Sequence, residues 1–168
     1  MAFKDIDIKE LTFSPFAKIG DEWALVTAGD EEASNTMTVS WGGLGVVWGK
    51  NVATIYIRPQ RYTKEFVDTA ERFTLSFYGP EYKEALNVPG SESGRDTDKV
   101  AQVGFTPVYL DGTTAYEQAD LVLVCRKLYA DDIKPERFID QTCDADFYPE
   151  HDYHTMYIAE VERALVHA

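Results

Sequence analysis

The close spacing of short strand-like segments is the feature of this sequence that most constrains its fold. Val, Ile, Thr, Tyr, Phe and Trp gather in short runs, which is typical of strands, and an Asp-Gly pair between two of the runs indicates a hairpin. Such short separations leave little room for the crossover helices of a parallel sheet. The sequence therefore predicts a mostly β fold, an antiparallel barrel, with strands at residues 23–27, 36–41, 52–58, 73–78, 108–110, 115–116, 121–129 and 156–164.

A few short helices are expected between these strands. Each is indicated by a residue type that caps helix N-termini or opens a helical turn, followed by a short helical pattern. The predicted helices cover residues 64–72, capped by Thr63, residues 80–86, and a segment that ends at residue 103 and is capped by Asp96 or Thr97.

Length and charge limit the classes of function. A chain of 168 residues with 45% apolar content can bury one sizeable core, so we expect a single domain over residues 1–168. The formal net charge is −13, from 29 acidic against 16 basic residues. Because a polyanion is repelled by such a chain, nucleic acid is not an expected partner.

The cysteines and the hydropathy pattern indicate a soluble cytoplasmic protein. Cys125 and Cys143 are the only cysteines and form no C-x-x-C pair, which favours a reducing compartment, although one disulfide stays an alternative. Cys125 stands in an apolar strand and is expected to be a small buried residue. The first ten residues contain no apolar signal core, and no apolar run approaches the roughly 18 residues of a membrane span. No membrane association is therefore predicted.

Residues 35–66 combine hydroxyl groups, glycines, tryptophans and cations. Strand alternation places Ala53, Ile55 and Ile57 on one face of their strand and leaves Thr54, Tyr56 and Arg58 on the other. The same alternation aligns the hydroxyls of Thr36, Thr38 and Ser40, which have two interpretations: donors to a polar ligand or a solvated strand face.

Three cations follow within seven residues. Arg58, Arg61 and Lys64 have no acid among them, although acids prevail in the rest of the chain. Arg61 can fork onto a phosphate, and Thr63 and the N–H groups that open the next helix can add donors. The residues alone leave a phosphate site and an ordinary solvated surface as alternatives.

The glycine-rich segment between Trp41 and Gly49 is not a dinucleotide fingerprint. Trp48 stands where the third glycine belongs, and the segment leads to a strand instead of opening a helix. We interpret it as a bulged loop flanked by aromatic residues. Its two tryptophans are expected either in the core or beside a planar aromatic ligand.

Cys143, Asp146, His151 and His154 also lie near one another in the sequence. Their spacing matches no zinc pattern, and the Asp-Phe-Tyr-Pro-Glu segment among them is interpreted as an acidic loop. No metal site is predicted there.

Four pieces of the sequence, taken in order, carry a resemblance. They are Asn35-Thr36-Met37-Thr38-Val39-Ser40-Trp41, Arg58-Pro59-Gln60-Arg61-Tyr62-Thr63, Ser93-Gly94-Arg95-Asp96-Thr97-Asp98-Lys99 and Asp152-Tyr153-His154-Thr155. Over roughly residues 23–161, the chain resembles the FMN-binding split β-barrel family of flavin reductases and flavoredoxins. The resemblance implies a Greek-key split β-barrel with a few short helices, a homodimer, and FMN held non-covalently near the subunit interface.

The resemblance also implies roles for individual residues. Residues 35–41 would line the isoalloxazine and ribityl chain, Arg61 and Thr63 would take the phosphate with help from Arg58, and residues 93–99 would close the site. His154 would be the catalytic residue, near the flavin where a nicotinamide or substrate can stack, with a structural histidine as the alternative. The implied cofactor-binding residues are Asn35, Thr36, Met37, Thr38, Val39, Ser40, Trp41, Arg58, Arg61, Tyr62, Thr63, Ser93, Gly94, Arg95, Asp96 and Lys99.

The function implied is an FMN-dependent oxidoreductase that accepts hydride from NADH or NADPH and reduces a small-molecule or protein acceptor. Flavin reductases that release flavin commonly have a proline-rich turn after the tryptophan, where this chain has glycines, so the resemblance is nearer to the flavoredoxin-like branch that retains FMN. Two alternatives stay open: a non-catalytic FMN electron carrier that serves a protein partner, and a β-barrel module for another phosphorylated aromatic ligand.

Overall fold

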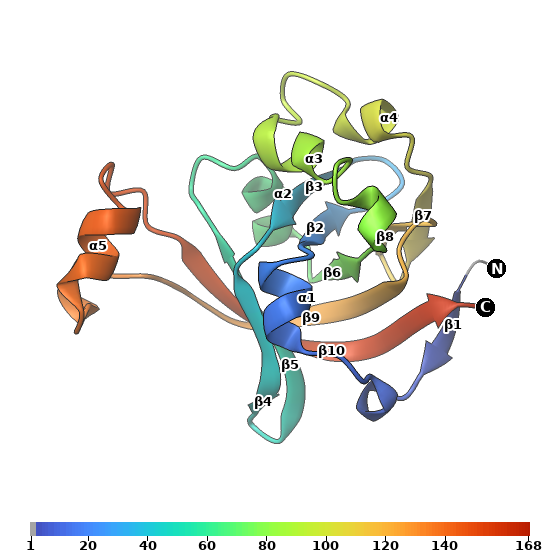
Figure 1. Ribbon diagram of the computed structural model, residues 1–168, viewed down its shortest axis with the longest axis horizontal. Helices are drawn as coiled ribbons and strands as arrows, with labels where there is room; N and C mark the ends of the chain where they lie inside the picture. The colour runs from blue at the N-terminus through green and yellow to red at the C-terminus, as the bar shows by residue number, and fades with distance from the viewer. Residues whose placement is uncertain (1–2) are drawn as a thin grey trace.

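A large antiparallel sheet organises the computed structural model, which describes residues 3–168 (Figure 1). Its strand order is β3-β2-β6-β9-β10-β5-β4, with β1 added on β10, and a separate hairpin pairs β7 with β8. The mostly β prediction is confirmed. The strands are β1 (Phe3–Ile6), β2 (Ala24–Gly29), β3 (Ser34–Val39), β4 (Gly42–Val47), β5 (Lys50–Ile57), β6 (Arg72–Phe77), β7 (Pro107–Leu110), β8 (Thr113–Tyr116), β9 (Leu121–Asp132) and β10 (Thr155–His167).

Two long strands bend the sheet. β9 and β10 pair along most of their length, and register shifts interrupt the ladder between Ile158 and Ala159 and between Val161 and Arg163. Because a bulge bends a strand and increases its twist, the two halves of β10 can serve different neighbours. The other edge of β10 pairs first with β5 and then with β1.

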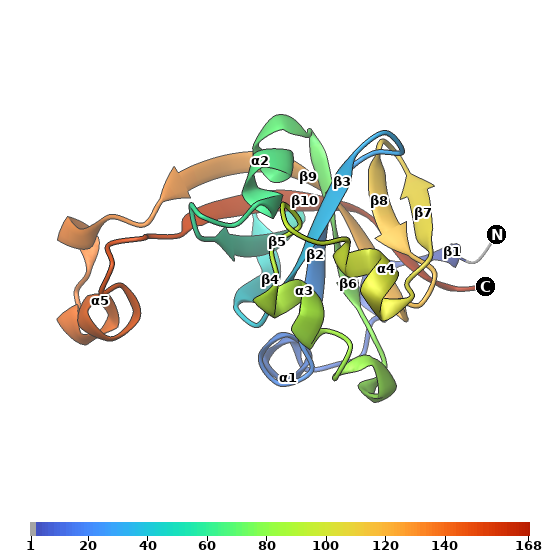
Figure 2. The same cartoon turned by 90° about the horizontal axis from the view of Figure 1, so that it is seen from above.

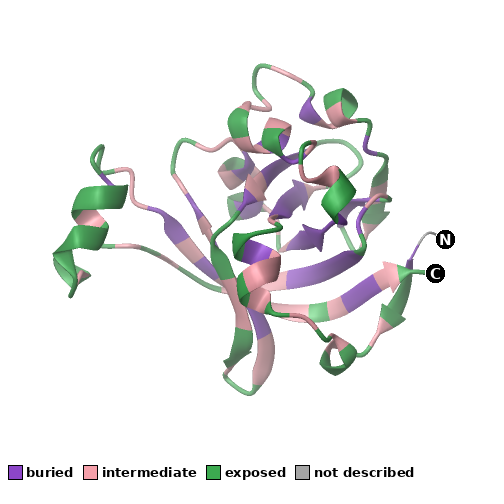
Figure 3. Ribbon diagram, in the orientation of Figure 1, coloured by how far each residue is buried: buried purple, intermediate pink, exposed green. Residues whose placement is uncertain are grey.

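The sheet is buried on both faces over its central strands (Figure 3). One core gathers the inward residues of six strands, including Ile55, Phe73 and Leu123, and the predicted inward set of β5 is confirmed there. A second core, which includes Phe105 and Tyr116, lies on the opposite face. Cys125 is fully buried as predicted, Cys143 is exposed, and both are free thiols.

Short helices connect these strands, and in the described part of the chain none is long and apolar enough to cross a membrane. Around the functional strands, α3 lies against β3, and α4 follows it in the segment that leads to the β7–β8 hairpin (Figure 2). The helices are α1 (Pro15–Gly20), α2 (Thr63–Thr69), α3 (Asn87–Ser91), α4 (Lys99–Val103) and α5 (Gln141–Phe147), with 3-10 turns at Ile8–Glu10, Pro80–Tyr82 and Pro135–Arg137.

The predicted helix boundaries need correction. α2 begins at Thr63 and ends at Thr69. Thr63 is not its cap, because the Thr63 hydroxyl donates to Asn35 Oδ1 at 2.8 Å. For α4 the cap is Asp98, whose carboxylate accepts from the Ala101 N–H at 3.0 Å. Of residues 80–86, only the first three form a helix, a 3-10 turn.

The glycine-rich segment is a strand, not the bulged loop that we expected. β4 pairs with β5, and the two-residue turn between them is Trp48-Gly49, both with positive φ (53° and 69°). This is the left-handed geometry of a type I′ hairpin turn, which glycine adopts readily. Trp41 and Trp48 are 43% and 58% exposed, so neither is a core residue.

The predicted acidic loop is also partly helical. Residues 141–147 form α5, which is capped by the Asp140 side chain accepting from the Thr142 N–H at 3.0 Å. α5 lies at the end of an arm that projects from the barrel between β9 and β10 (Figures 1 and 2). Most of the arm is exposed (Figure 3).

Candidate functional site

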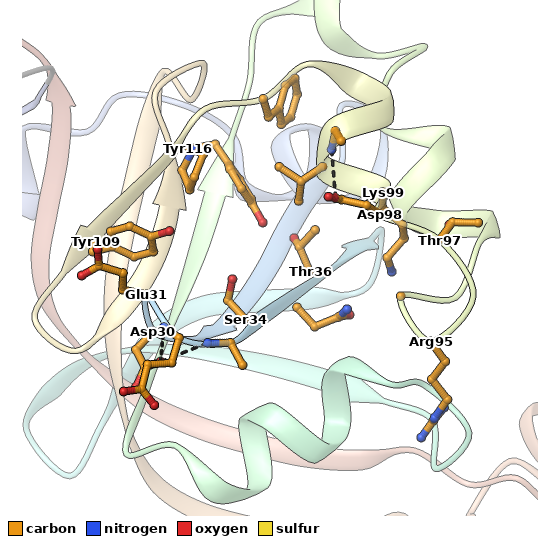
Figure 4. A pocket seen from close by; sticks show the side chains of 18 of the residues that line it. Asp30, Glu31, Ser34, Thr36, Arg95, Thr97, Asp98, Lys99, Tyr109 and Tyr116 are labelled. Atoms are coloured by element: carbon orange, nitrogen blue, oxygen red, sulfur yellow. Dashed lines mark hydrogen bonds between the residues drawn. The ribbon is translucent and has the colours of Figure 1, made fainter.

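Most of the predicted site residues line two hollows along β3. The first, which we call the arginine pocket, has a volume of about 230 Å³ and is lined by Met37, Thr38, Val39, Ser40, Trp41, Tyr56, Arg58, Arg61 and His154. The second, which we call the lysine pocket, has a volume of about 690 Å³. Its predicted site residues are Asn35, Thr36, Gly94, Arg95, Asp96 and Lys99 (Figure 4).

Three predicted residues line neither hollow. The Arg95 guanidinium lies over the Tyr62 ring, with its central carbon 4.5 Å from the ring centroid. Thr63 is buried against Asn35, and the Ser93 hydroxyl accepts from the Arg95 N–H at 3.2 Å. These residues therefore support the pocket walls. Tyr56 is a wall residue absent from the predicted set, although strand alternation already placed it on the outward face of β5 beside Arg58.

Residues 86–99 lie on β3 between these hollows. The Thr38 hydroxyl donates to the Leu86 carbonyl at 2.5 Å. A Cβ added at Gly90 would lie 3.3 Å from Thr38 Cβ, and one at Gly94 would overlap the Asn35 amide. The absence of side chains at these two glycines thus lets the segment lie directly on the strand.

Two cations meet under this segment. Arg61 donates from Nη1 to the Gly90 carbonyl at 3.0 Å and from Nη2 to the Pro89 carbonyl at 3.1 Å, while Lys99 Nζ contacts the same Pro89 carbonyl at 3.4 Å. Lys99 is only 4% exposed. Within residues 3–168, neither cation forms a salt bridge with a carboxylate.

Burial changes the proton affinity of both groups, and for Lys99 the charge of Glu92 offsets only part of the effect. Desolvation lowers the pKa of Arg61. Desolvation, followed by the charge of Arg61, lowers the pKa of Lys99 from 10.5 to about 8. Both shifts have the direction expected when positive charge is held in a buried place, and a bound anion would relieve them.

The neighbouring cations have partners of their own. Arg58 forms a salt bridge with Asp152 at 2.8 Å and donates to the Phe147 carbonyl at 2.9 Å. Arg95 pairs with Glu65, and Lys64 pairs with Asp68 at 2.8 Å. Of the three cations noted in residues 58–64, only Arg61 lacks a carboxylate partner, because Asp152, distant in sequence, reaches Arg58, and Asp68, one helical turn further on, pairs with Lys64.

Of the aligned hydroxyls of Thr36, Thr38 and Ser40, two are already hydrogen-bonded within the protein. Thr36 Oγ1 shares a 2.8 Å hydrogen bond with Thr27 Oγ1, and Thr38 is bonded to the backbone of residue 86. The exposed Ser40 hydroxyl makes no hydrogen bond within the described residues. Ser40 is therefore the member of the row that is available to a ligand without rearrangement.

His154 lines the arginine pocket beside Trp41 and Tyr56. Its Nδ1 is 2.7 Å from the Tyr148 hydroxyl, and its ring lies 5.2 Å from the Trp41 ring, centroid to centroid. Burial, followed by the positive charge of Arg58, lowers the pKa of His154 from 6.5 to about 4. His154 is thus neutral at physiological pH, and Nε2 makes no hydrogen bond within the described residues.

The lysine pocket has a different character. The β2–β3 turn, residues 94–101 and the β7–β8 hairpin supply its walls (Figure 4). The Tyr116 hydroxyl is buried there without a hydrogen-bond partner among residues 3–168. Asp30, Glu31 and Asp98 give this pocket a strongly polar lining, in contrast to the aromatic wall of the arginine pocket.

Comparison with solved structures identifies the fold. An FMN-binding domain of a flavin reductases-like enzyme from Shewanella baltica superposes with a TM-score of 0.69 at 15% identity, covering 98% of this chain and 77% of the other. Flavoredoxin of Desulfovibrio vulgaris gives 0.66 at 20% identity, covering 86% and 68%. The styrene monooxygenase flavin reductase of Pseudomonas putida gives 0.61 at 17% identity, covering 85% and 77%. These likenesses confirm the predicted split β-barrel.

Sequence comparison adds the family. No curated protein matches the chain. The family model of the flavin reductase like domain, however, matches residues 16–168, which include β2 to β10 and every predicted site residue. The chain therefore belongs to the flavin reductase like domain family.

Proposed function

We propose that this protein is an oxidoreductase that retains FMN, accepts hydride from NADH or NADPH, and passes the electrons to a further acceptor. The observation that carries this proposal is the neighbouring pair of partly buried Arg61 and buried Lys99, two cations that form no salt bridge within residues 3–168 and lie beside a pocket lined by aromatic residues. A flavin mononucleotide has the matching chemistry, a phosphate dianion joined to a planar ring. Family membership and the likeness to flavin reductases support the same assignment.

The residues present fit FMN. Arg61 and Lys99 would hold the phosphate, since charged hydrogen bonds from a guanidinium and an ammonium are the strong ones for this group. Trp41 and Tyr56 would border the ring, and the free Ser40 hydroxyl and His154 Nε2 offer hydrogen bonds on that side. FMN, when bound, supplies hydride and electron transfer, so the protein is required to bind, orient and exclude water.

Retention of FMN is part of the proposal. In place of a proline-rich turn, residues 42–47 form β4 and continue the sheet beside Trp41. Because β4 pairs with β5 and follows Trp41 directly, the sheet holds the backbone next to this wall residue of the arginine pocket. Rigid, pre-organised walls favour tight binding because little ordering is required when the ligand enters.

The absorbance spectrum of the isolated protein tests the proposed function. We expect a yellow protein with a flavin spectrum that bleaches when NADH or NADPH is added without oxygen. A yellow protein that neither nucleotide bleaches would contradict the enzyme and favour an electron carrier. A colourless protein that does not take up added FMN would contradict both.

We also propose that the protein is a homodimer. Large apolar side chains are exposed on the arm: Phe147 is 48% exposed and Ile139 is fully exposed. A twofold dimer would remove these side chains from water, and it is the commonest arrangement of soluble oligomers. Sedimentation at micromolar concentration should give a dimer, and Ile139→Glu should shift it towards monomer. A wild-type monomer with FMN bound would refute the dimer.

The cytoplasm is our proposed location. Cys125 and Cys143 are both free thiols, which suits a reducing compartment. Fractionation of the source cells, with an antibody against the protein, tests this assignment.

A further inference from the structure

A third hollow continues from the arginine pocket. This apolar groove has a volume of about 630 Å³ and shares Ser40, Trp41 and Tyr56 with the arginine pocket. It runs between α1, the start of β4 and the base of the arm. The remaining lining residues are Pro15, Phe16, Ile19, Gly20, Gly42, Gly43, Leu44, Ile133 and Tyr148.

The groove contains no charged residue, although 27% of the chain is charged. A ligand that carries phosphates or carboxylates would lose its hydration there without gaining an ion pair, so the lining selects against it. A planar uncharged molecule, in contrast, can place its ring against the apolar side chains of Trp41, Leu44 and Phe16, and the contact would also cover Phe16, which is 89% exposed in the free protein. The volume is within the range of small-molecule sites.

Polar groups stand only where the two hollows meet. The Tyr56 hydroxyl makes no hydrogen bond within the described residues, and Tyr56 lines both hollows. Tyr148 lines the groove, and its hydroxyl is bonded to His154, which lines the arginine pocket. A carbonyl oxygen on a ring in the groove therefore has a hydrogen-bond donor at the junction, next to the place proposed for the flavin.

We propose that the electron acceptor is a small uncharged quinone that binds in the apolar groove. This inference rests on the proposed function and names its acceptor. The reaction balances as quinone plus NAD(P)H plus one solvent proton giving hydroquinone plus NAD(P)⁺. The nicotinamide supplies two electrons and one proton equivalent as hydride, and the quinone carbonyl oxygens receive both protons.

Binding of 1,4-naphthoquinone tests the inference independently of turnover. Equilibrium dialysis against the FMN-loaded protein compares the wild type with Phe16→Asp, which puts a carboxylate at the groove, and with Val46→Asp. Val46 lies on β4 outside the groove and is 72% exposed, so its variant is the matched control. Loss of one aromatic contact and introduction of a charge should weaken naphthoquinone binding at least about tenfold in Phe16→Asp only.

A charged probe and sedimentation complete the test. We expect 1,4-naphthoquinone-2-sulfonate to bind at least about tenfold more weakly than naphthoquinone, because its sulfonate has no partner in the groove. Equal binding of the two quinones, or equal binding by wild type and Phe16→Asp, would overturn the proposal. So would a Phe16→Asp protein that becomes monomeric while naphthoquinone binding is unchanged, since the groove would then be a subunit contact. Bleaching of the wild-type flavin by NADH, measured without quinone, tests the proposed function separately.

Discussion

Arg61→Ala should lose most of its FMN while the protein stays folded. Arg61 offers two N–H groups at the position proposed for the phosphate, where they now meet the carbonyls of Pro89 and Gly90. Charged hydrogen bonds are worth roughly 1.5–3 kcal/mol each, which corresponds to about 10- to 150-fold in affinity for each bond lost. Dissociation constants for FMN, measured by fluorescence titration of both proteins, check the expected loss.

Riboflavin and a second arginine variant are the controls. Riboflavin has the same ring without the phosphate, so its affinity should be low and almost the same in wild type and Arg61→Ala. Arg126→Ala removes the same side chain from an ion-pair network with Glu160 and Glu162 on the sheet, away from both pockets, and should leave FMN affinity unchanged. Equal FMN affinity in wild type and Arg61→Ala would remove Arg61 from the site.

The fold should survive Arg61→Ala because opposing contributions to stability are lost together. The substitution removes two hydrogen bonds that hold residues 89–90. It also removes a partly buried positive charge whose pKa is lowered by desolvation. The net change in the free energy of unfolding is expected to be within about 1 kcal/mol. Circular dichroism during urea denaturation measures it.

Lys99→Met should stabilise the flavin-free protein and weaken FMN binding at the same time. In the folded protein the pKa of Lys99 is lowered from 10.5 to about 8, so the charged form carries a penalty in the native state at pH 7. Methionine is an unbranched side chain of similar length that carries no charge. We expect the free energy of unfolding to rise by about 1–3 kcal/mol at pH 7, whereas loss of a charged phosphate contact should weaken FMN binding about tenfold or more.

The pH dependence identifies the cause of this stabilisation. Below pH 8, Lys99 is protonated in both folded and unfolded chains, and the full penalty is present. Between pH 8 and 10.5 the folded protein loses this proton while the unfolded chain keeps it, so the stability of the wild type gains from Lys99 as pH rises. Lys99→Met should lack this component in denaturant unfolding curves at pH 7, 8.5 and 10. A variant that is less stable at pH 7 and keeps the same pH slope would show that Lys99 is paired rather than strained.

Sequence patterns predicted the strands because burial and alternation are local properties. The inward set Ala53, Ile55 and Ile57 was visible from β-branched residues at every second position, and the structure confirms it. β4 was missed because four of the residues at 42–49 are glycine, which strands normally avoid, and its extended form depends on pairing with β5. α5 was missed because its residues show no apolar face with helical spacing, although Asp140, a typical N-cap residue, precedes them.

The site was only partly accessible to the same reasoning. Counting charges along residues 58–64 suggested three cations without partners, but Asp152 reaches Arg58 from 94 residues away in sequence. The burial of Lys99 next to Arg61 carries no local signal, and only the family resemblance brought Lys99 into the set. The neutral state of His154 similarly depends on a tertiary environment formed with Arg58.

The contacts between residues 86–99 and the two cations have a consequence for selectivity among anions. At the proposed phosphate position a ligand would enter by exchange, because its oxygens would replace the Pro89 and Gly90 carbonyls that now contact Arg61 and Lys99. The binding free energy would then be the difference between the hydrogen bonds gained with the ligand and those lost with the two carbonyls. The affinity would be lowered further because only those molecules in which residues 86–99 have moved aside can bind. Neutral acceptors and weakly charged ions gain almost nothing from this exchange. A dianion would gain from both cations at once, so competition with the two carbonyls would favour phosphate monoesters over monovalent anions at the proposed site.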